Sequence, residues 1–254
     1  MRLGVLGWPV AHSRSPAMHT AALTAAGLEG WTYQLLPVPP EAFADTVRAL
    51  PAAGFRGANV TIPHKEAALA LADRATERAR EIGAANTLAF GSDGIEADNT
   101  DAPGLLAALG APPASALVLG AGGAARAAVW ALRGADARVA VLNRTRTRAE
   151  NLVEDLGGAV VDDWEEAELL VNATSVGLRG EPFTSFGVEV DALHLFRRVV
   201  DLVYRPDGTA LVTHARERGL VTVDGHEVLA RQGALSFERW IGRPAPLEAM
   251  RRAI

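Results

Sequence analysis

The chain has 254 residues, of which 49% are hydrophobic and 22% charged, and its formal net charge is −5. This composition is that of a globular protein with a sizeable core, and the acidic balance argues against a nucleic-acid partner. Cysteine is absent, which excludes disulfides, a thiolate nucleophile and Cys-ligated metal sites. The six histidines form no His-x-x-x-His pair, so we expect no metal ion.

The N-terminus begins directly with a strand-like apolar run and carries no charged-then-apolar leader. No apolar stretch in the sequence is long enough to span a bilayer. We therefore predict a cytoplasmic protein without a membrane partner.

The first fifty residues predict two strand–helix pairs. Residues 3–7 and 31–38 have the pattern of strands, and residues 17–26 and 40–50 that of helices.

A loop with two hydroxyl groups precedes the first of these helices. Ser15 followed by Pro16 predicts a helix N-cap with proline at the first helical position, which accounts for Ser15 but not for Ser13. Hydroxyl groups at a helix N-terminus are also suited to holding a carboxylate.

Lys65 is the only lysine in the chain, since the other 24 basic residues of the 25 are arginines. Arginine keeps its proton in proteins whereas lysine can release one, so Lys65 is a candidate for proton chemistry. Residues 55–60 predict a strand, Thr61 a cap for the next helix, and Pro63 its first turn, which contains Lys65. The positive end of the helix dipole disfavours a cation there, which suits a proton donor. The alternative is a solvated lysine offset by Glu66.

The next segment predicts a short polar helix over residues 76–82 and a hairpin with strands 87–90 and 95–97. A further helix is expected from Asp101 to Leu109. Taken alone, the position of Asp101 favours the role of N-cap for that helix.

A second α/β segment follows the linker at residues 110–113. A buried strand at 116–119 leads directly into Gly120-Ala121-Gly122-Gly123-Ala124, and a helix then runs to Leu132. The spacing G-x-G-x-x-A between a strand and a helix is where a dinucleotide pyrophosphate is bound.

The following strand, residues 138–142, ends in Asn143-Arg144-Thr145-Arg146-Thr147-Arg148. A site selective for NAD places Asp or Glu near this point, on the ribose 2′-hydroxyl. Three arginines and two threonines suit a 2′-phosphate instead, so we predict NADP as the cofactor. A solvated charged turn is the alternative, and the glycine turn upstream at the right spacing favours the cofactor.

The remainder repeats the alternation of strands and helices. Strands are expected at 169–175, 199–203 and 221–223, and helices at 209–218, 225–240 and 247–254. Residues 178–198 give no prediction. This alternation predicts an α/β fold with a largely parallel sheet.

Asparagine is concentrated where the predicted strands end. Five of the six asparagines lie at such exits or beside the glycine turn, at positions 59, 86, 99, 143 and 172. Because ligands of open α/β sheets bind outside the carboxyl ends of the strands, we expect the functional site there.

These motifs resemble those of the shikimate dehydrogenase family, which includes shikimate/quinate dehydrogenases, along the whole chain. The matching motifs, in order, are Ser13-x-Ser15-Pro16, Asn59-Val60-Thr61-x-Pro63-x-Lys65, Gly83-Ala84-Ala85-Asn86-Thr87, Asn99-Thr100-Asp101-x-x-Gly104, Gly120-Ala121-Gly122-Gly123-Ala124-x-Arg126, Asn143-Arg144-Thr145, Asn172-Ala173-Thr174-Ser175-x-Gly177, Asp201-x-x-Tyr204-x-Pro206 and Gln232-Gly233.

The resemblance implies two α/β domains with the active site in the cleft between them. Residues 1–101 plus 226–254 would form the substrate-binding domain, with a mostly parallel sheet and the C-terminal helices packed back on it. Residues 102–225 would form a Rossmann-type NADP-binding domain. The implied activity is the reversible NADPH-dependent reduction of 3-dehydroshikimate to shikimate in aromatic amino-acid biosynthesis, by a monomer or homodimer.

The resemblance also implies roles for individual residues. The catalytic pair would be Lys65 and Asp101. Ser13 and Ser15 would bind the substrate carboxylate. The remaining substrate-binding residues would be Asn59, Thr61, Asn86, Tyr204 and Gln232, alongside the catalytic pair. Cofactor contacts would come from Gly120, Ala121, Gly122, Gly123, Ala124, Asn143, Arg144, Thr145, Arg148, Thr174, Val203 and Gly225.

Three positions depart from the family pattern. Arg14 stands where an apolar residue is usual and adds charge to the carboxylate loop, while Leu178 and Val228 replace methionines with other apolar residues. Two alternative functions are a quinate/shikimate dehydrogenase with looser cofactor use and a non-catalytic NADP-binding sensor on the same fold. The Arg144 motif argues against NAD preference, and the intact Lys65 and Asp101 argue against the sensor.

Overall fold

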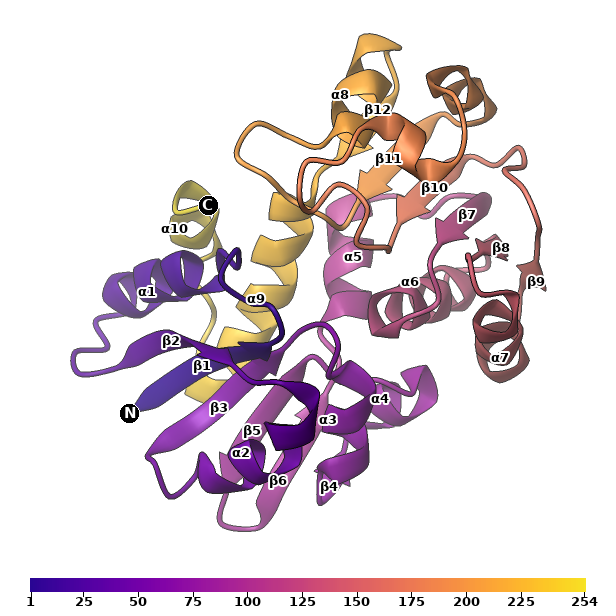
Figure 1. Ribbon diagram of the computed structural model, residues 1–254. Coiled ribbons are helices and arrows are strands. Elements are labelled where there is room, and N and C mark those ends of the chain that lie inside the picture. Colours follow the sequence, from indigo (N-terminus) through magenta and orange to yellow (C-terminus); the bar gives the residue numbers. More distant parts are fainter. The chain divides into compact units, whose positions relative to one another are not determined.

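The computed structural model describes residues 1–254 and divides into two compact units (Figure 1). Unit 1 comprises Met1–Gly104 and Leu229–Ile254, and unit 2 comprises Leu105–Val228. Each division lies three residues further along the chain than the family resemblance implies. No helix combines the length and the apolar character needed to cross a membrane.

Unit 1 contains a six-stranded sheet in the order β2-β1-β3-β5-β6-β4. The strands are β1 (Arg2–Gly7), β2 (Thr32–Pro37), β3 (Phe55–Val60), β4 (Arg74–Ala75), β5 (Thr87–Gly91) and β6 (Gly94–Asp98). The β3–β5 and β5–β6 pairs are antiparallel and the others parallel. The ends of β1, β3 and β6 therefore meet the beginning of β5 at one edge of the sheet.

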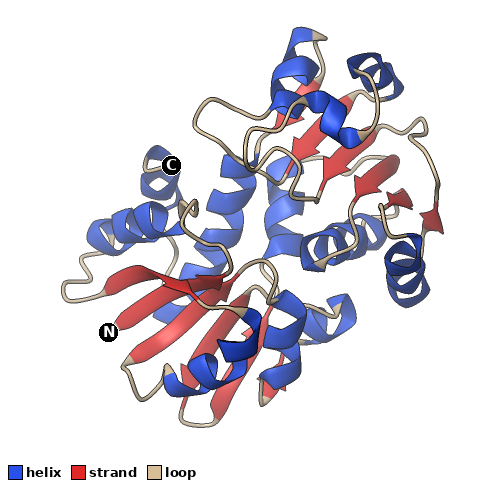
Figure 2. Ribbon diagram, viewed as in Figure 1, coloured by secondary structure: helices blue, strands red, loops and turns tan.

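Helices cover both faces of this sheet (Figure 2). They are α1 (Ser15–Ala25), η1 (Pro40–Ala42), α2 (Phe43–Ala49), α3 (Lys65–Leu71), α4 (Glu77–Ile82), α9 (Gly225–Ile241) and α10 (Leu247–Arg252). One core joins α1, α9 and α10 to alternate residues of β1, among them Leu3 and Val5. A second core packs α2 and α3 against Leu6 and Leu88 on the opposite face.

Unit 2 contains a six-stranded, entirely parallel sheet in the order β12-β11-β10-β7-β8-β9. The strands are β7 (Ser115–Leu119), β8 (Arg138–Leu142), β9 (Ala159–Val160), β10 (Leu169–Asn172), β11 (Arg198–Asp201) and β12 (Val221–Val223). Its central strands are almost fully buried, as expected for a parallel sheet covered on both faces.

The helices of unit 2 cover the two faces of this sheet. They are α5 (Asp101–Leu109), whose first four residues belong to unit 1, α6 (Gly123–Gly134), α7 (Arg146–Leu156), η2 (Phe183–Phe186), η3 (Val190–Leu195) and α8 (Ala210–Glu217). Leu132 of α6 and Leu152 of α7 lie in one core, while Leu193 and Leu211 lie in the other. The α/β prediction is confirmed, and the strands expected at 138–142 and 221–223 have those bounds.

Candidate active site

An ion pair between Lys65 and Asp101 lies at the strand-end edge of the sheet in unit 1. Lys65 Nζ donates to Asp101 Oδ2 over 2.6 Å. Lys65 is the first residue of α3 and Asp101 the first of α5, so each side chain is presented by a helix beginning. The two side chains are 15% and 20% exposed, so the pair is sheltered yet still accessible.

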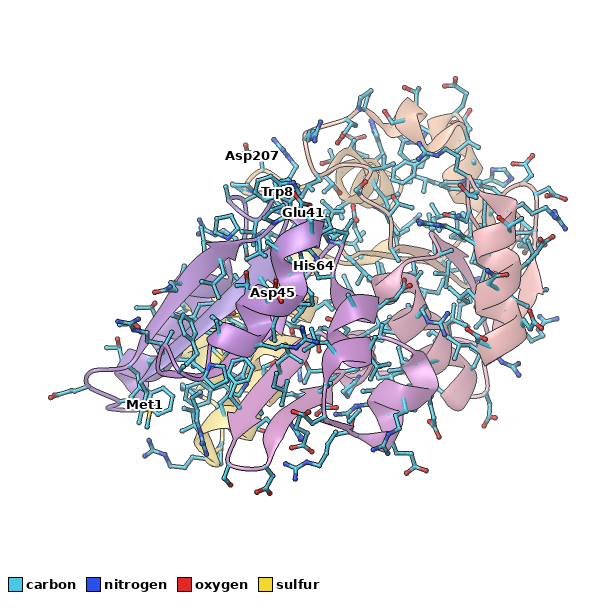
Figure 3. The ribbon with its side chains drawn as sticks, turned by 60° about the horizontal axis from the view of Figure 1, so that its bottom comes forward. Met1, Trp8, Glu41, Asp45, His64 and Asp207 are labelled. Carbon is cyan, nitrogen blue, oxygen red and sulfur yellow. The ribbon has the colours of Figure 1, made fainter.

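His64 fixes the turn that presents Lys65. Its ring is buried, stacks on Phe43 with centroids 4.3 Å apart, and donates from Nε2 to the carbonyl of Val38 over 2.7 Å. Figure 3 labels His64 beside the helix that carries Asp45, which is α2. Burial lowers the pKa of His64, which favours the neutral ring.

The expected helix cap at Thr61 is not formed. The residue before α3 is His64, and no side chain caps the helix; Thr61 contributes only its carbonyl, which accepts from the His64 amide. Thr61 stays partly exposed beside β1, where a Cβ on Gly7 would lie 2.5 Å from the Thr61 methyl. The close approach of these strand ends therefore requires glycine at position 7.

Asn86 connects the ion pair to the C-terminal helix α9. Its Nδ2 donates to Asp101 Oδ1 over 2.8 Å and to Gln232 Oε1 over 3.0 Å, and its Oδ1 accepts from the Thr100 amide over 2.7 Å. Asn86 and Gln232 are 146 residues apart in sequence, and both are more than 90% buried. The structure thus brings four predicted substrate residues, Lys65, Asn86, Asp101 and Gln232, into one cluster.

Asn59 lies behind this cluster rather than in it. Its Oδ1 accepts from the Tyr33 hydroxyl over 2.8 Å, and its Nδ2 donates to the Asn86 carbonyl over 3.1 Å and to Ser236 Oγ over 3.0 Å. With the side chain 5% exposed and these groups engaged, Asn59 supports Asn86, and its predicted contact with the substrate stays a prediction.

Asp98, the last residue of β6, is a buried carboxylate that the sequence motifs did not single out. Asp98 accepts from Thr76 Oγ1 over 2.7 Å, from Arg78 over 2.8 Å and from the Asn99 amide over 2.7 Å. Asn99 Oδ1 in turn accepts from the Ala102 amide over 3.2 Å. Asn99 therefore performs the capping predicted for Asp101, which leaves the Asp101 carboxylate for Lys65 and Asn86.

The hydroxyl loop before α1 differs from prediction in its cap. Ser15 is the first residue of the helix and its hydroxyl caps nothing, whereas Ser13 Oγ accepts from the Ser15 amide over 3.3 Å. Pro16 occupies the second helical position. Ser13 is half-buried and Ser15 buried.

The glycine turn of unit 2 lies between β7 and α6. Gly120 has a φ of 111°, and a Cβ there would lie 2.9 Å from the Ala173 carbonyl oxygen, so both the conformation and the packing require glycine. Gly122 precedes the helix, and a Cβ there would meet no atom within 4 Å. An open glycine at the start of a 12-residue helix fits the predicted pyrophosphate site.

The three arginines after β8 have different environments. Arg146 is engaged by Glu150 and Asp162. Arg144 and Arg148 are exposed and form no ion pair or side-chain hydrogen bond. Asn143 Nδ2 donates to the carbonyl of Thr145 over 2.8 Å, which shapes the turn. The two unengaged guanidinium groups are those predicted to bind the 2′-phosphate.

The remaining predicted residues of unit 2 follow β10, β11 and β12. Thr174 Oγ1 donates to Asn172 Oδ1 over 2.7 Å. The Val203 amide donates to Asp201 Oδ1 over 3.0 Å, and a Cβ on Gly225 would lie 2.8 Å from the Val203 carbonyl oxygen. Desolvation raises the pKa of Asp201 to about 6.

A cavity of about 240 Å³ opens beside these strand exits. Tyr204 lines it and stands 5.3 Å, centroid to centroid, from His226. Val203 and Thr209 also contribute to its wall. No group of three or more His, Asp or Glu side chains in either unit is arranged to hold a metal ion.

Comparisons with known proteins agree with this arrangement. The model of the shikimate dehydrogenase substrate binding domain matches residues 5–88, that of shikimate/quinate 5-dehydrogenase matches 109–176, and that of the shikimate 5′-dehydrogenase C-terminal domain matches 225–254. The shikimate dehydrogenase (NADP(+)) of Methylobacterium radiotolerans is 51% identical over 96% of this chain and 92% of its own length. That of Roseobacter denitrificans is 47% identical over 99% and 96%.

Solved structures agree as well. Shikimate 5-dehydrogenase from Thermus thermophilus, crystallised with NADP(H) and shikimate, is 44% identical with a TM-score of 0.87, covering 100% of this chain and 98% of its own. Shikimate dehydrogenase from Aquifex aeolicus has a TM-score of 0.89 at 34% identity, covering 100% and 97%. By sequence along nearly its whole length and by fold, the chain belongs to the shikimate dehydrogenase family.

Proposed function

We propose that this chain catalyses the reversible NADPH-dependent reduction of 3-dehydroshikimate to shikimate, a step of aromatic amino-acid biosynthesis. Its relatives of 47–51% identity are NADP-dependent shikimate dehydrogenases, matched over nearly their full lengths. The observation that carries the proposal is the 2.6 Å Lys65–Asp101 ion pair with Asn86 and Gln232 at the same strand-end edge.

Lys65 is the proton donor in this proposal. NADPH supplies the hydride that goes to the ring carbonyl carbon. The carbonyl oxygen then becomes an alkoxide and takes a proton from Lys65 Nζ; in the oxidative direction the neutral amine takes the proton back from the hydroxyl. Asp101 orients Nζ through its 2.6 Å contact and offsets the charge that Lys65 carries between turnovers.

The substrate groups are assigned to side chains whose hydrogen-bonding capacity matches them. Ser13 and Ser15 bind the ring carboxylate from the loop before α1. Asn86, Asp101 and Gln232 bind the ring hydroxyls, with Thr61 and Tyr204 nearby. Because Asn86 carries both donor and acceptor atoms, the rigid cluster around it distinguishes hydroxyl positions on the ring.

The cofactor is assigned to unit 2. The Gly120–Ala124 turn holds the pyrophosphate against the beginning of α6. Asn143, Arg144, Thr145 and Arg148 hold the adenosine 2′-phosphate, because Arg144 and Arg148 are exposed guanidinium groups without carboxylate partners. The nicotinamide half is assigned to Thr174, Val203 and Gly225.

An absorbance assay of nicotinamide reduction tests this function with four pairings, namely shikimate or quinate with NADP⁺ or NAD⁺. We expect oxidation of shikimate with NADP⁺ to exceed the other three rates. Comparable rates with quinate would establish the broader shikimate/quinate activity, and no turnover of either acid would leave an NADP-binding sensor.

Because the reaction uses NADPH and a small soluble acid, we place the enzyme in the cytoplasm. We propose that it acts as a monomer or homodimer.

A further inference from the structure

Asp201 ends β11 as a carboxylate with no exposed surface, and the proposed mechanism gives it no task. Three groups donate to it. Asn172 Nδ2 lies 2.8 Å and the Val203 amide 3.0 Å from Oδ1, and Thr209 Oγ1 lies 2.5 Å from Oδ2. Asn172 ends β10, whereas Thr209 caps α8 at the far end of the loop that follows Asp201.

Two of these contacts, those of Asn172 and of the Val203 amide, fix segments assigned to the nicotinamide or the substrate. Asn172 Oδ1 accepts from both the amide and the hydroxyl of Thr174, at 3.0 and 2.7 Å, and its Nδ2 also donates to the Val176 carbonyl. The Val203 amide is fixed one residue before Tyr204. A Cβ on Gly225 would lie 2.8 Å from the Val203 carbonyl oxygen, so the exit of β12 packs on the same segment.

We propose that Asp201 is the positioning residue that joins the exits of β10 and β11, and through Val203 the exit of β12, so that Thr174, Val203, Tyr204 and Gly225 take one fixed arrangement. The inference rests on the proposed function, which assigns those four residues to the nicotinamide half of the cofactor and to the substrate. Asp201 itself touches neither.

The polarity of the contacts explains why an acceptor is needed at this position. The Val203 amide can only donate. The Asn172 side chain is held in one orientation, because its oxygen accepts from Thr174 and its nitrogen donates to Val176. Residue 201 must therefore accept twice on one oxygen. An asparagine carbonyl would also do this, with its amide group facing the Thr209 hydroxyl, which is able to accept.

The test compares Asp201→Ala with Asp201→Asn, and uses Asp207→Ala as the matched control because Asp207 is an exposed carboxylate of the same loop (Figure 3). Asp201→Ala should lower kcat/KM for shikimate about 10- to 100-fold, since it leaves three buried donors without an acceptor. Asp201→Asn should stay within about threefold of the wild type because it retains the acceptor oxygen. Asp207→Ala should match the wild type.

Binding of a cofactor fragment separates positioning from general damage to the fold. Adenosine 2′,5′-bisphosphate carries the adenine half of NADP but no nicotinamide. Asp201→Ala should bind this fragment within about twofold of the wild type while binding NADP⁺ several-fold more weakly. Equal weakening of both ligands, or unchanged NADP⁺ affinity and kcat/KM, would overturn the inference.

Two further measurements keep the result interpretable. If Asp201→Ala does not fold, Thr209→Val removes one of the three contacts. It should weaken binding of NADP⁺ more than binding of adenosine 2′,5′-bisphosphate, by a smaller factor than Asp201→Ala, whereas Thr209→Ser should not. A Thr209→Val protein identical to the wild type would also overturn the inference. If the wild type oxidises no shikimate, the proposed function fails, and the comparison of NADP⁺ with its fragment still decides the role of Asp201.

Discussion

At the scale of single residues, Lys65 differs from the other basic residues in the chemistry it permits. The chain uses arginine at its 24 other basic positions, so arginine would be the conservative substitution in this protein. The structure shows why position 65 is different. A compact ammonium group meets Asp101 Oδ2 at 2.6 Å in a space bounded by the turn at His64. A planar guanidinium is larger and keeps its proton.

We predict that Lys65→Arg lowers kcat about 10²- to 10⁴-fold, the usual contribution of a positioned acid or base. Binding of NADP⁺ and shikimate should change little, because the charge is retained. Lys65→Ala should be similarly slow, and adding Asp101→Ala should cost far less than the product of the single losses, because the pair acts as one unit. Steady-state kinetics and ligand titrations measure both quantities. A Lys65→Arg enzyme with most of its kcat would reduce Lys65 to an electrostatic anchor.

Arg144→Ala should weaken binding of NADP⁺ about 10- to 100-fold, since a hydrogen bond to a charged group contributes about 1.5–3 kcal/mol. Affinity for NAD⁺ should be nearly unchanged because NAD⁺ lacks the 2′-phosphate. Arg146→Ala is the matched control, as that guanidinium already pairs with Glu150 and Asp162. Fluorescence titration with both cofactors gives the answer, and equal weakening of the two would disprove the assignment of Arg144.

At the scale of helices and strands, the ends of elements are where prediction and structure differ. Hydrophobic patterning located β3 and β8 to the residue, because buried strands carry their signal locally. It missed β4, which has two residues and exists through pairing with β6, and it assigned nothing to α7 or β9. Caps depend on how the preceding turn folds, and sequence alone does not give that.

For the site as well, the sequence predicted local features, and the structure was needed for contacts between distant segments. Family motifs identified Lys65, Asp101 and Asn86, whereas the contact between Asn86 and Gln232 spans 146 residues and required the fold. The supporting groups Asp98 and Ser236 went unnoticed because their role comes entirely from neighbours distant in sequence.

The contact of Ser13 with the first residue of α1 gives Ser13→Ala two expected effects. Ser13 Oγ accepts from the Ser15 amide at the start of the helix, so its loss should lower the free energy of unfolding by about 1 kcal/mol or less, in addition to raising KM for shikimate. Ser13→Thr retains the hydroxyl and should restore stability. Urea denaturation and initial-rate kinetics measure the two effects. Wild-type KM in Ser13→Ala would exclude Ser13 from the carboxylate site.

His19 on α1 should make unit 1 sensitive to acid. The side chain is fully buried, stacks on Tyr33 with ring centroids 4.4 Å apart, and has no hydrogen-bond partner for either ring nitrogen. Burial lowers the pKa of His19 from 6.5 to about 3. Because the unfolded chain binds this proton first, the contribution of His19 to stability is retained above pH 6.5 and is lost as the pH falls toward 3.

Between pH 7 and pH 4 this loss should amount to about 3 kcal/mol in the free energy of unfolding. His19→Phe keeps the ring and removes the titration, so its stability should fall less over the same interval. Urea denaturation of both proteins at several pH values provides the comparison. Parallel pH profiles for His19→Phe and the wild type would assign the acid sensitivity to other groups.

At the scale of the whole molecule, the two units differ in the number of chain segments that form them. Unit 2 is one continuous segment whose two cores draw on residues 105–228 alone. Unit 1 is discontinuous, because Phe237 and Met250 from the C-terminal helices share a core with Leu3 and Val5.

Residues 105–228 produced alone should therefore fold cooperatively and bind adenosine 2′,5′-bisphosphate with an affinity close to that of the full chain. Residues 1–104 alone should not fold, because their core lacks α9 and α10. Circular dichroism with thermal melting, together with fragment titration, tests both statements. A folded 1–104 segment, or an unfolded 105–228 segment, would contradict this division of stability.

The solitary lysine also makes the molecule unusually simple to observe. Protein grown on isotopically labelled lysine would carry the label at one position among 254, which is the proposed proton donor. Its single resonance needs no assignment and would follow the ionisation of that amine directly, with and without NADP⁺ or shikimate. Amine-selective reagents have the same advantage, because the α-amino group is the only other amine that competes with Lys65. The Lys65 side chain is 15% exposed, so its rate of modification would report on access to this site.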